Sequence, residues 1–230
     1  MSPLISVIIP VGPGEESLQQ LLSDLQSAPT KIEVIIVKSE EVEQKLELAA
    51  ADRKCRVLSA SSGRASQMNA GAKSAAGEFL LFLHADSRIE RRAWDALFDS
   101  IEHYPGCLHY FELSFQNDGP ILMKLNAWGV WFRSHWLKIP FGDQGLCVSG
   151  ELFDRVGGFD TSVPYGEDHV FVWTARLHRI RLRCTGATLQ TSARKYRQRG
   201  WLRTTMRHVY LTVRQALPFW WRLVRRKWLA

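Results

Sequence analysis

The chain has 230 residues, of which 46% are hydrophobic and 23% charged, which is the composition of a globular protein rather than of a disordered chain. Its formal net charge of +7 is unevenly distributed, because residues 169–230 contain 15 Lys and Arg and no Asp or Glu. Such a segment predicts a basic face for phosphates, anionic lipid or nucleic acid, with a merely solvated surface as the alternative. Four widely spaced cysteines, no visible signal peptide and no apolar run long enough to cross a bilayer indicate a cytoplasmic protein.

The first part of the chain alternates predicted strands and helices. Short apolar or β-branched runs, typical of strands buried in a sheet, occupy residues 4–11, 33–38, 55–59 and 79–83. Helical spacing or composition occurs between them, at 15–26, 42–51 and 64–76. This order predicts an α/β fold with a mostly parallel, Rossmann-like central sheet that has helices on both faces.

The second part of the chain follows a different pattern. Residues 109–115 tend to alternate apolar and polar side chains, as an antiparallel or edge strand does. Residues 120–137 place aromatic side chains at helical spacing, a pattern that is most often part of a core. We also expect helices at 91–101, 151–156 and 165–179 and a strand at 182–189. No linker justifies an internal boundary, so the prediction is one domain over 1–200 and a helical tail over 201–230.

The first candidate site is the loop at Gly63 and the predicted helix that begins at Arg64. A helix N-terminus offers free N–H groups to a phosphate, and an arginine adds a forked cation. A tight turn before an ordinary Ala-rich helix explains the same residues.

The second candidate site, His84-Ala85-Asp86, directly follows the buried run at 79–83. Open α/β sheets bind ligands at the carboxyl ends of their strands. One Asp can suffice to hold Mn²⁺ or Mg²⁺ there, because substrate phosphates and water complete the shell. We expect His84 to support Asp86 rather than to bind the metal. The alternatives are that Asp86 caps the next helix and that His84 is an ordinary core histidine.

The third candidate site, Gly166-Glu167-Asp168, begins a predicted helix. One carboxylate is a candidate general base, and the other would hold an acceptor or the nearby backbone. The turn Gly142-Asp143-Gln144 would then form a wall of the acceptor pocket. Adjacent carboxylates at a helix start are also common as surface groups that complement the helix dipole.

Five motifs occur in an order that resembles the family 2 glycosyltransferases. They are Ser6-Val-Ile-Ile-Pro10, Asn69-Ala-Gly71, residues 77–86, Gly157-Gly-Phe-Asp160 and Glu167-Asp168. The chain is most similar to a short bacterial subgroup that reads Gly-Arg-Ala-x-Gln-Met-Asn-Ala-Gly-Ala before a Leu-His-Ala-Asp, which matches residues 63–72 and 83–86. The likeness covers nearly the whole chain, from residue 5 to residue 203.

The resemblance implies a GT-A fold, a nucleotide-diphosphate sugar donor, a divalent cation (Mn²⁺ or Mg²⁺) and inversion at the anomeric carbon. By position, it implies that Asp86 binds the metal and the diphosphate and that Asp168 is the catalytic base. We expect the acceptor site at Glu167, Gly142, Asp143 and Gln144. The residues expected at the donor site are Pro10, Val11, Lys38, Arg64, Gln67, Asn69, His84, Ala85, Asp86, Arg194 and Arg199.

Two positions depart from the pattern of that family. Lys38-Ser39-Glu40 stands where many relatives have an acidic pair that holds the uracil or the ribose, and His84 replaces the first acid of the Asp-x-Asp motif. One alternative function is a nucleotidyltransferase, although its loop usually follows the first strand directly and it needs no base at Glu167-Asp168. Another is a non-catalytic basic membrane-binding protein, which would explain the tail but not the ordered motifs.

The tail at 201–230 combines an apolar stripe with arginines and tryptophans, and Pro218 predicts an interruption. Trp with Arg and Lys on an amphipathic helix suits a membrane interface. A lipid-linked acceptor at the inner face of the cell membrane would fit this interpretation. A helix packed on the sheet or in a dimer seam is an equal alternative. We expect no nucleic-acid partner, and the sugar, the base, the acceptor and the oligomeric state are left open.

Overall fold

The computed structural model describes residues 4–13, 15, 17–29, 31–40 and 55–228, with side chains described as far as residue 225. The predicted helix at 42–51 lies outside the described residues.

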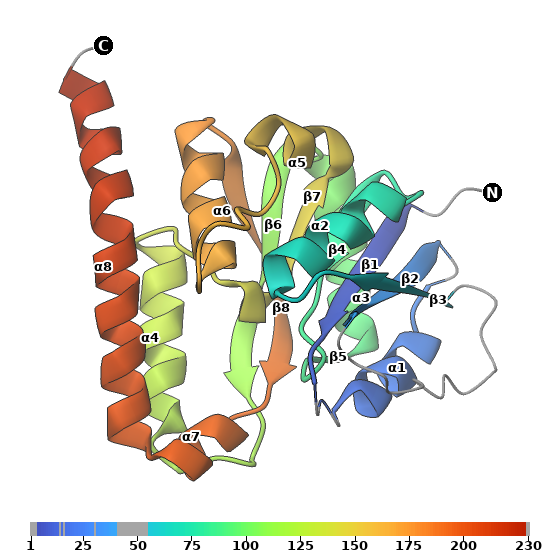
Figure 1. Cartoon of the computed structure of the whole chain (residues 1–230), viewed down its shortest axis with the longest axis horizontal. Helices are drawn as coiled ribbons and strands as arrows, with labels where there is room; N and C mark the ends of the chain where they lie inside the picture. The colour runs from blue at the N-terminus through green and yellow to red at the C-terminus, as the bar shows by residue number, and fades with distance from the viewer. Residues whose placement is uncertain (1–3, 14, 16, 30, 41–54, 229–230) are drawn as a thin grey trace.

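An eight-stranded mixed sheet forms the centre of the molecule (Figure 1). Its strand order is β3-β2-β1-β4-β7-β6-β8-β5. The strands from β3 to β4 are parallel and form one half, whereas β7 runs antiparallel to both β4 and β6. The strands are β1 (Ile5–Val11), β2 (Ile32–Ser39), β3 (Cys55–Ala60), β4 (Phe79–Phe82), β5 (Arg88–Ile89), β6 (Cys107–Phe115), β7 (Leu146–Ser149) and β8 (Arg181–Thr191).

Strand β1 is the central strand of the parallel half. All seven of its residues are buried, and it pairs with β2 on one side and β4 on the other. Pro10 has no N–H to donate to a neighbouring strand. Pairing with β4 ends at Ile8, so Pro10 lies beyond the last rung on that side. A proline is therefore tolerated near the carboxyl end of this central strand, because no hydrogen bond to β4 is lost there.

Helices cover both faces of the parallel half. Alternate residues of β1 point to opposite faces, so Val7 joins a core with α1 (Leu18–Gln26) and α3 (Arg91–His103). Ile8 joins the core on the other face, which contains side chains of α2 (Arg64–Ser74), α5 (Gly150–Val156) and α6 (Glu167–Leu177). The predicted α/β fold with helices on both faces is therefore confirmed.

Three more helices lie beside the β6–β8 half of the sheet (Figure 1). They are α4 (Met123–His135), α7 (Arg194–Arg199) and α8 (Trp201–Trp228). In the described residues, no helix has both the length and the hydropathy that crossing a bilayer requires.

The structure corrects three expectations. The aromatic stripe of α4 is not core, because Trp128 is 66% and Trp136 is 70% exposed. Helix α8 passes through Pro218 without a break, and contacts on either side of the proline hold it against α6. Strands β5 and β7 and helix α7 were not expected, because elements of two to six residues are too short to show a period.

Gln67 ties together the ends of two strands. It is 3% exposed, and its Nε2 donates to the carbonyl oxygens of Val11, at 2.8 Å, and Val37, at 2.7 Å. We predict that Gln67→Leu lowers the free energy of unfolding by about 1–3 kcal/mol, because two buried carbonyls lose their partner. Lys73→Ala, on the exposed side of the same helix, is the matched control. Urea unfolding measures both, and equal midpoints for the two variants would contradict the role given to Gln67.

Candidate active site

The carboxyl ends of β1, β2 and β4 lie at the same edge of the sheet as the N-termini of α2 and α6 (Figure 1). His84, Ala85 and Asp86 follow β4 at this edge. Helix α3 begins at Arg91 with Glu90 as its N-cap, so Asp86 does not cap it. The alternative explanation of Asp86 as a helix cap is therefore wrong.

Glu167 and Asp168 begin α6 and are buried. They are 5% and 8% exposed, so they are not ordinary surface groups at a helix start. The Oε1 atom of Glu167 lies 2.7 Å from Nε of Arg64, the first residue of α2. This ion pair joins the N-termini of two helices that are about a hundred residues apart in the sequence, and it brings Arg64 to Asp168.

Asp168 is held as a buried carboxylate. Its Oδ2 accepts a 2.5 Å hydrogen bond from the backbone N–H of Gly142. Burial alone would raise the pKa of Asp168, but the charge of Arg64, the Gly142 N–H and His84 together lower the pKa below its ordinary value. The carboxylate is therefore ionised at neutral pH and able to accept a proton.

Gly142 is required by close approach rather than by its backbone angles. A Cβ atom at this position would lie 2.8 Å from Oδ2 of Asp168 and 3.0 Å from Nε2 of His84. His84 and Asp168 thus flank the same backbone segment. Burial, followed by the charge of Arg64, lowers the pKa of His84 to about 4, so the imidazole is neutral at neutral pH.

Asp143 adds a third acid beside Asp86 and Asp168. Its Oδ1 is buried and has no hydrogen-bond partner. Burial raises the pKa of Asp143 to about 6; Arg133 opposes this rise, whereas Asp168 and Asp86 add to it. Asp86 and Asp168, which are far apart in the sequence, therefore both raise the pKa of Asp143.

Arg133 is a site residue that the sequence analysis missed. Its guanidinium lies over the ring of Phe141, 3.3 Å from the centroid, and its Nη2 donates to Oε1 of Gln144 at 3.1 Å. An arginine within the aromatic run of α4 could have indicated this role. It was not considered because that run was interpreted as part of the core.

Three amide side chains hold the backbone around the site. Gln67 joins the ends of β1 and β2, and Asn69 exchanges hydrogen bonds of 2.8 and 2.9 Å with the backbone of Phe159. Gln144 is fully buried, and its amide bonds Ser134, Arg133 and the backbone of Phe111. These amides support the site, with Gln144 holding the turn that contains Gly142 and Asp143.

Other predicted donor residues lie around the same edge. Pro10 and Val11 end β1, and half-buried Lys38 lies near the end of β2. Arg194 and Arg199 are exposed at the two ends of α7. It is Lys195, between them, whose charge acts on His84 and lowers its pKa. The basic loop expected from 194–199 thus reaches the site at a residue that was not singled out.

Helix α8 supports the loop that leads into the two acids. His169 Nδ1 and Gln215 Oε1 are 2.8 Å apart, and Gln215 Nε2 donates to the carbonyl of Tyr165 at 3.0 Å. Nε1 of Trp173 donates to Nε2 of His169, so Nδ1 carries the hydrogen given to Gln215. These bonds hold both sides of Gly166, whose φ of 65° is in the left-handed region. Gln215 had no signal in the sequence.

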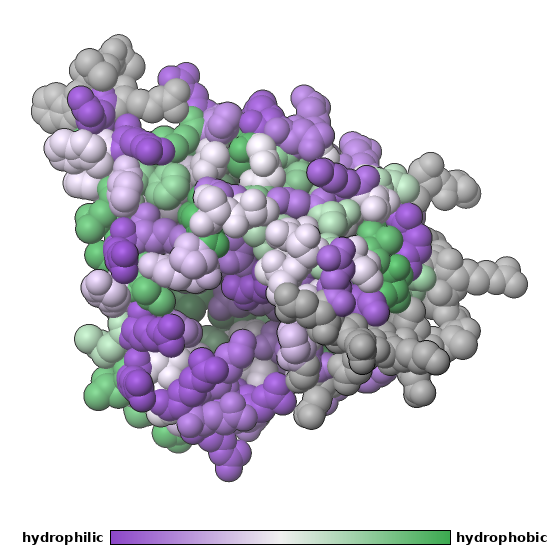
Figure 2. Space-filling view, viewed as in Figure 1, coloured by the Kyte–Doolittle hydropathy of each residue, from purple (hydrophilic) through white to green (hydrophobic). Residues whose placement is uncertain are grey.

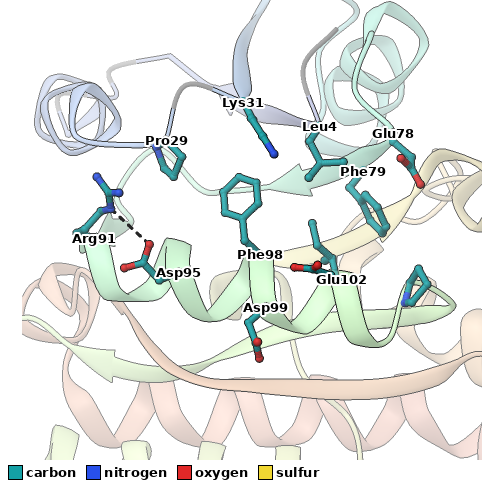
Figure 3. Close-up of a pocket in the computed structure, with 12 residues that line it drawn as sticks. Leu4, Pro29, Lys31, Glu78, Phe79, Arg91, Asp95, Phe98, Asp99 and Glu102 are labelled. Carbon is teal, nitrogen blue, oxygen red and sulfur yellow. Dashed lines mark hydrogen bonds and ion pairs between the residues drawn. The ribbon is translucent and has the colours of Figure 1, made fainter. Parts of the chain in front are cut away.

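Two other features of the described residues are separate from this site. Glu112, His135 and Cys184 bring potential metal-ligand atoms within 4.8 Å of one another, and the group does not include Asp86. A groove along α3 lies by the amino-terminal ends of β1 and β4, where Leu4 and Phe79 line it (Figure 3). It is therefore at the end of these strands opposite to Asp86.

The sequence profile described as Glycosyl transferase family 2 matches residues 6–160. The chain belongs to this family. No curated protein matches the chain closely in sequence.

Solved structures of glycosyltransferases have the same fold. S. aureus TarS 1-349 in complex with UDP-GlcNAc is 21% identical with a TM-score of 0.63, over 82% of this chain and 58% of that chain. The mannosyltransferase PcManGT from Pyrobaculum calidifontis, in complex with GDP-Man and Mn²⁺, is 19% identical with a TM-score of 0.62, over 83% and 57%. The likeness establishes the GT-A fold of this chain, which spans less than two thirds of either protein.

The raised pKa of Asp143 gives a prediction on stability. The folded state holds this proton more tightly than the unfolded chain, where the pKa is near 3.8, so stability should fall as the pH rises from about 4 through about 6. Asp143→Asn does not titrate and should become progressively more stable relative to the wild type over this range.

Thermal unfolding at a series of pH values measures the difference between the two proteins. Asp154→Asn, at an exposed position of α5, is the matched control and should follow the wild-type curve. A difference that stays constant from pH 4 to pH 7 would contradict the buried, proton-retaining state of Asp143.

Proposed function

We propose that the protein is an inverting glycosyltransferase that moves a sugar from a nucleotide-diphosphate sugar to an acceptor hydroxyl, with Asp168 as general base. The observation that carries this proposal is the buried, ionised carboxylate of Asp168, which Gly142 and Arg64 stabilise. It lies close to His84, and Asp86 follows His84 in the sequence by two residues. Family membership supplies the class of reaction.

Asp168 is suited to accept the proton of the attacking hydroxyl. One oxygen is fixed by the Gly142 N–H, which orients the carboxylate. As the hydroxyl oxygen bonds to the anomeric carbon, its proton passes to Asp168 and the bond to the diphosphate breaks on the opposite side. A single displacement of this kind inverts the configuration at that carbon and needs one base.

The leaving diphosphate gathers negative charge, so nearby cations stabilise the transition state. Arg64 stands at the N-terminus of α2 and its side chain is 47% exposed, so its guanidinium can pair with Glu167 and still reach a phosphate. Lys195 adds a second cation close to His84. Arg64 is one of the donor residues that the resemblance implies, and Lys195 directly follows another, Arg194.

The acids of the site fit a divalent cation. Asp86 is near enough to raise the pKa of Asp143, whose buried Oδ1 has no partner, and carboxylate oxygens are the ligands that Mn²⁺ and Mg²⁺ prefer. We assign the metal to Asp86, with neutral His84 supporting it. When bound, the cation would neutralise charge on the diphosphate. PcManGT, solved with GDP-Man and Mn²⁺, supports the cofactor class.

The first test is Asp168→Asn. The amide cannot take the proton, so turnover of the nucleotide sugar should fall on the order of a hundred- to ten-thousandfold while donor affinity is retained. Glu151→Gln, an exposed acid in the first turn of α5, is the matched control and should keep full activity. Product formation with undiminished turnover in Asp168→Asn would remove this residue from the mechanism.

The second test is a thermal-shift screen of UDP-linked and GDP-linked sugars, each with and without Mn²⁺. A donor that binds only the folded state raises the melting temperature, and we expect the largest shift with the metal present. Asp86→Asn should lose the part of the shift that depends on Mn²⁺. If no nucleotide sugar shifts the melting temperature with or without the metal, the assignment of the donor site is wrong.

A further inference from the structure

Helices α4 and α8 each carry a stripe of exposed apolar side chains. Among the described residues, every large exposed apolar side chain except Val57 and Tyr104 lies between residues 121 and 137 or between 202 and 221. We call the following residues the α4–α8 face: Leu125, Trp128, Phe132, Trp136, Leu202, Met206, Val209, Val213 and Leu217, which are 42% to 70% exposed.

The two helices are adjacent, and polar side chains join them. Asn126 of α4 accepts from Nε1 of Trp201 at 2.6 Å and donates to Oγ1 of Thr205 at 3.2 Å. Thr204 is buried, and Gln215 bonds the α6 loop. A surface helix normally places its apolar side chains against the core, as Phe219 does against Trp173, but the apolar stripe of α8 from residue 202 to residue 217 is exposed. Contacts inside the chain therefore do not explain this stripe.

Basic side chains border the α4–α8 face. Arg203, Arg207, Arg214 and Arg222 are exposed on α8, and Figure 2 shows apolar and strongly polar side chains next to one another along this helix. A groove near the C-terminal end of α6 has no acidic side chain in its lining, which consists of Lys138, Arg176, Arg179, Ile180, Arg181, Leu182, Trp220, Leu223 and Val224. Its cations and apolar walls match a phosphate attached to an acyl chain.

We propose that the α4–α8 face docks on an anionic lipid bilayer and that the basic groove receives lipid phosphates. Tryptophans beside arginines are the composition of proteins that lie in the interface of a membrane. The apolar stripe of α8 runs from Leu202 to Leu217 and so extends over roughly 23 Å of the helix. The complete lack of acids in residues 169–230 favours an anionic surface.

A second copy of the chain fits this surface less well. Pairing two α4–α8 faces would bring the exposed arginines of two α8 helices together, and this part of the chain has no carboxylate to compensate them. A bilayer accepts the apolar side chains and supplies the negative charge at the same time.

If the protein docks in this way, the chemical class of the acceptor follows, an inference that rests on the proposed function. Helix α8 contacts the membrane with one side, and with the other it holds the loop before Asp168 through Gln215. The acceptor hydroxyl would then belong to an amphiphile that remains in the bilayer while it reaches Asp168.

The test is flotation of the full chain with vesicles, at low and at high salt. Vesicles of equal parts phosphatidylglycerol and phosphatidylcholine should retain the wild type, and pure phosphatidylcholine vesicles should retain much less. The double variant Trp128→Ser/Trp136→Ser should lose binding, and because both side chains are exposed, its melting temperature should not change. Arg179→Gln/Arg181→Gln should bind roughly tenfold more weakly, or worse, because two cations near the lipid surface are lost.

Tyr104→Ser and Arg91→Gln/Arg92→Gln are the matched controls, since they remove an exposed aromatic residue and an exposed basic pair elsewhere. The proposal is overturned if the wild type ignores anionic vesicles or if the tryptophan variant floats as well as the wild type. It is also overturned if light scattering shows that the wild type is an oligomer that does not bind vesicles and that the tryptophan substitutions dissociate it. Binding of RNA by the basic groove, without binding of anionic vesicles, would overturn it as well. Vesicle binding needs no sugar donor, so its failure is distinguishable from failure of the donor screen.

Discussion

The site depends on the compensation of one buried charge. Asp168 carries a negative charge in a position where burial favours the neutral acid, and an uncompensated charge of this kind is costly. Arg64 and the Gly142 N–H provide the compensation, and they come from parts of the chain that are distant in sequence. The geometry of the candidate site can therefore form only when α2, the turn at Gly142 and α6 are correctly placed relative to one another.

Much of the surrounding sequence holds these three pieces in place. Gln67 and Asn69 fix α2 against the ends of β1 and β2 and against the backbone of Phe159. Gln144 fixes the turn, and Gln215 fixes the start of α6. Four amide side chains thus hydrogen-bond buried groups around the site. Charged side chains in their place would carry a greater desolvation cost, because an amide can satisfy buried backbone groups without bringing a charge.

The parallel half of the fold was predictable from the sequence because its strands are short apolar runs between amphipathic helices. The positions of Arg64, His84, Asp86 and Asp168 followed from motifs at the ends of those elements. Other features could not be predicted because they depend on contacts between distant segments. The supporting role of Asn69 needs Phe159 at its side, and Lys195 reaches His84 only after β8 has returned the chain to the sheet.

The reading of α4 failed for a reason that bears on function. Helical spacing of aromatic residues predicts that one face is covered, but it does not say by what. Polar side chains join α4 and α8, while the aromatic side chains of α4 and the apolar stripe of α8 are exposed. A soluble acceptor would give no reason to keep such a face beside the loop that leads into Glu167 and Asp168. The proposed acceptor held in a bilayer does, because the helix that would meet the lipid also bonds Tyr165 and His169 on the two sides of the acids.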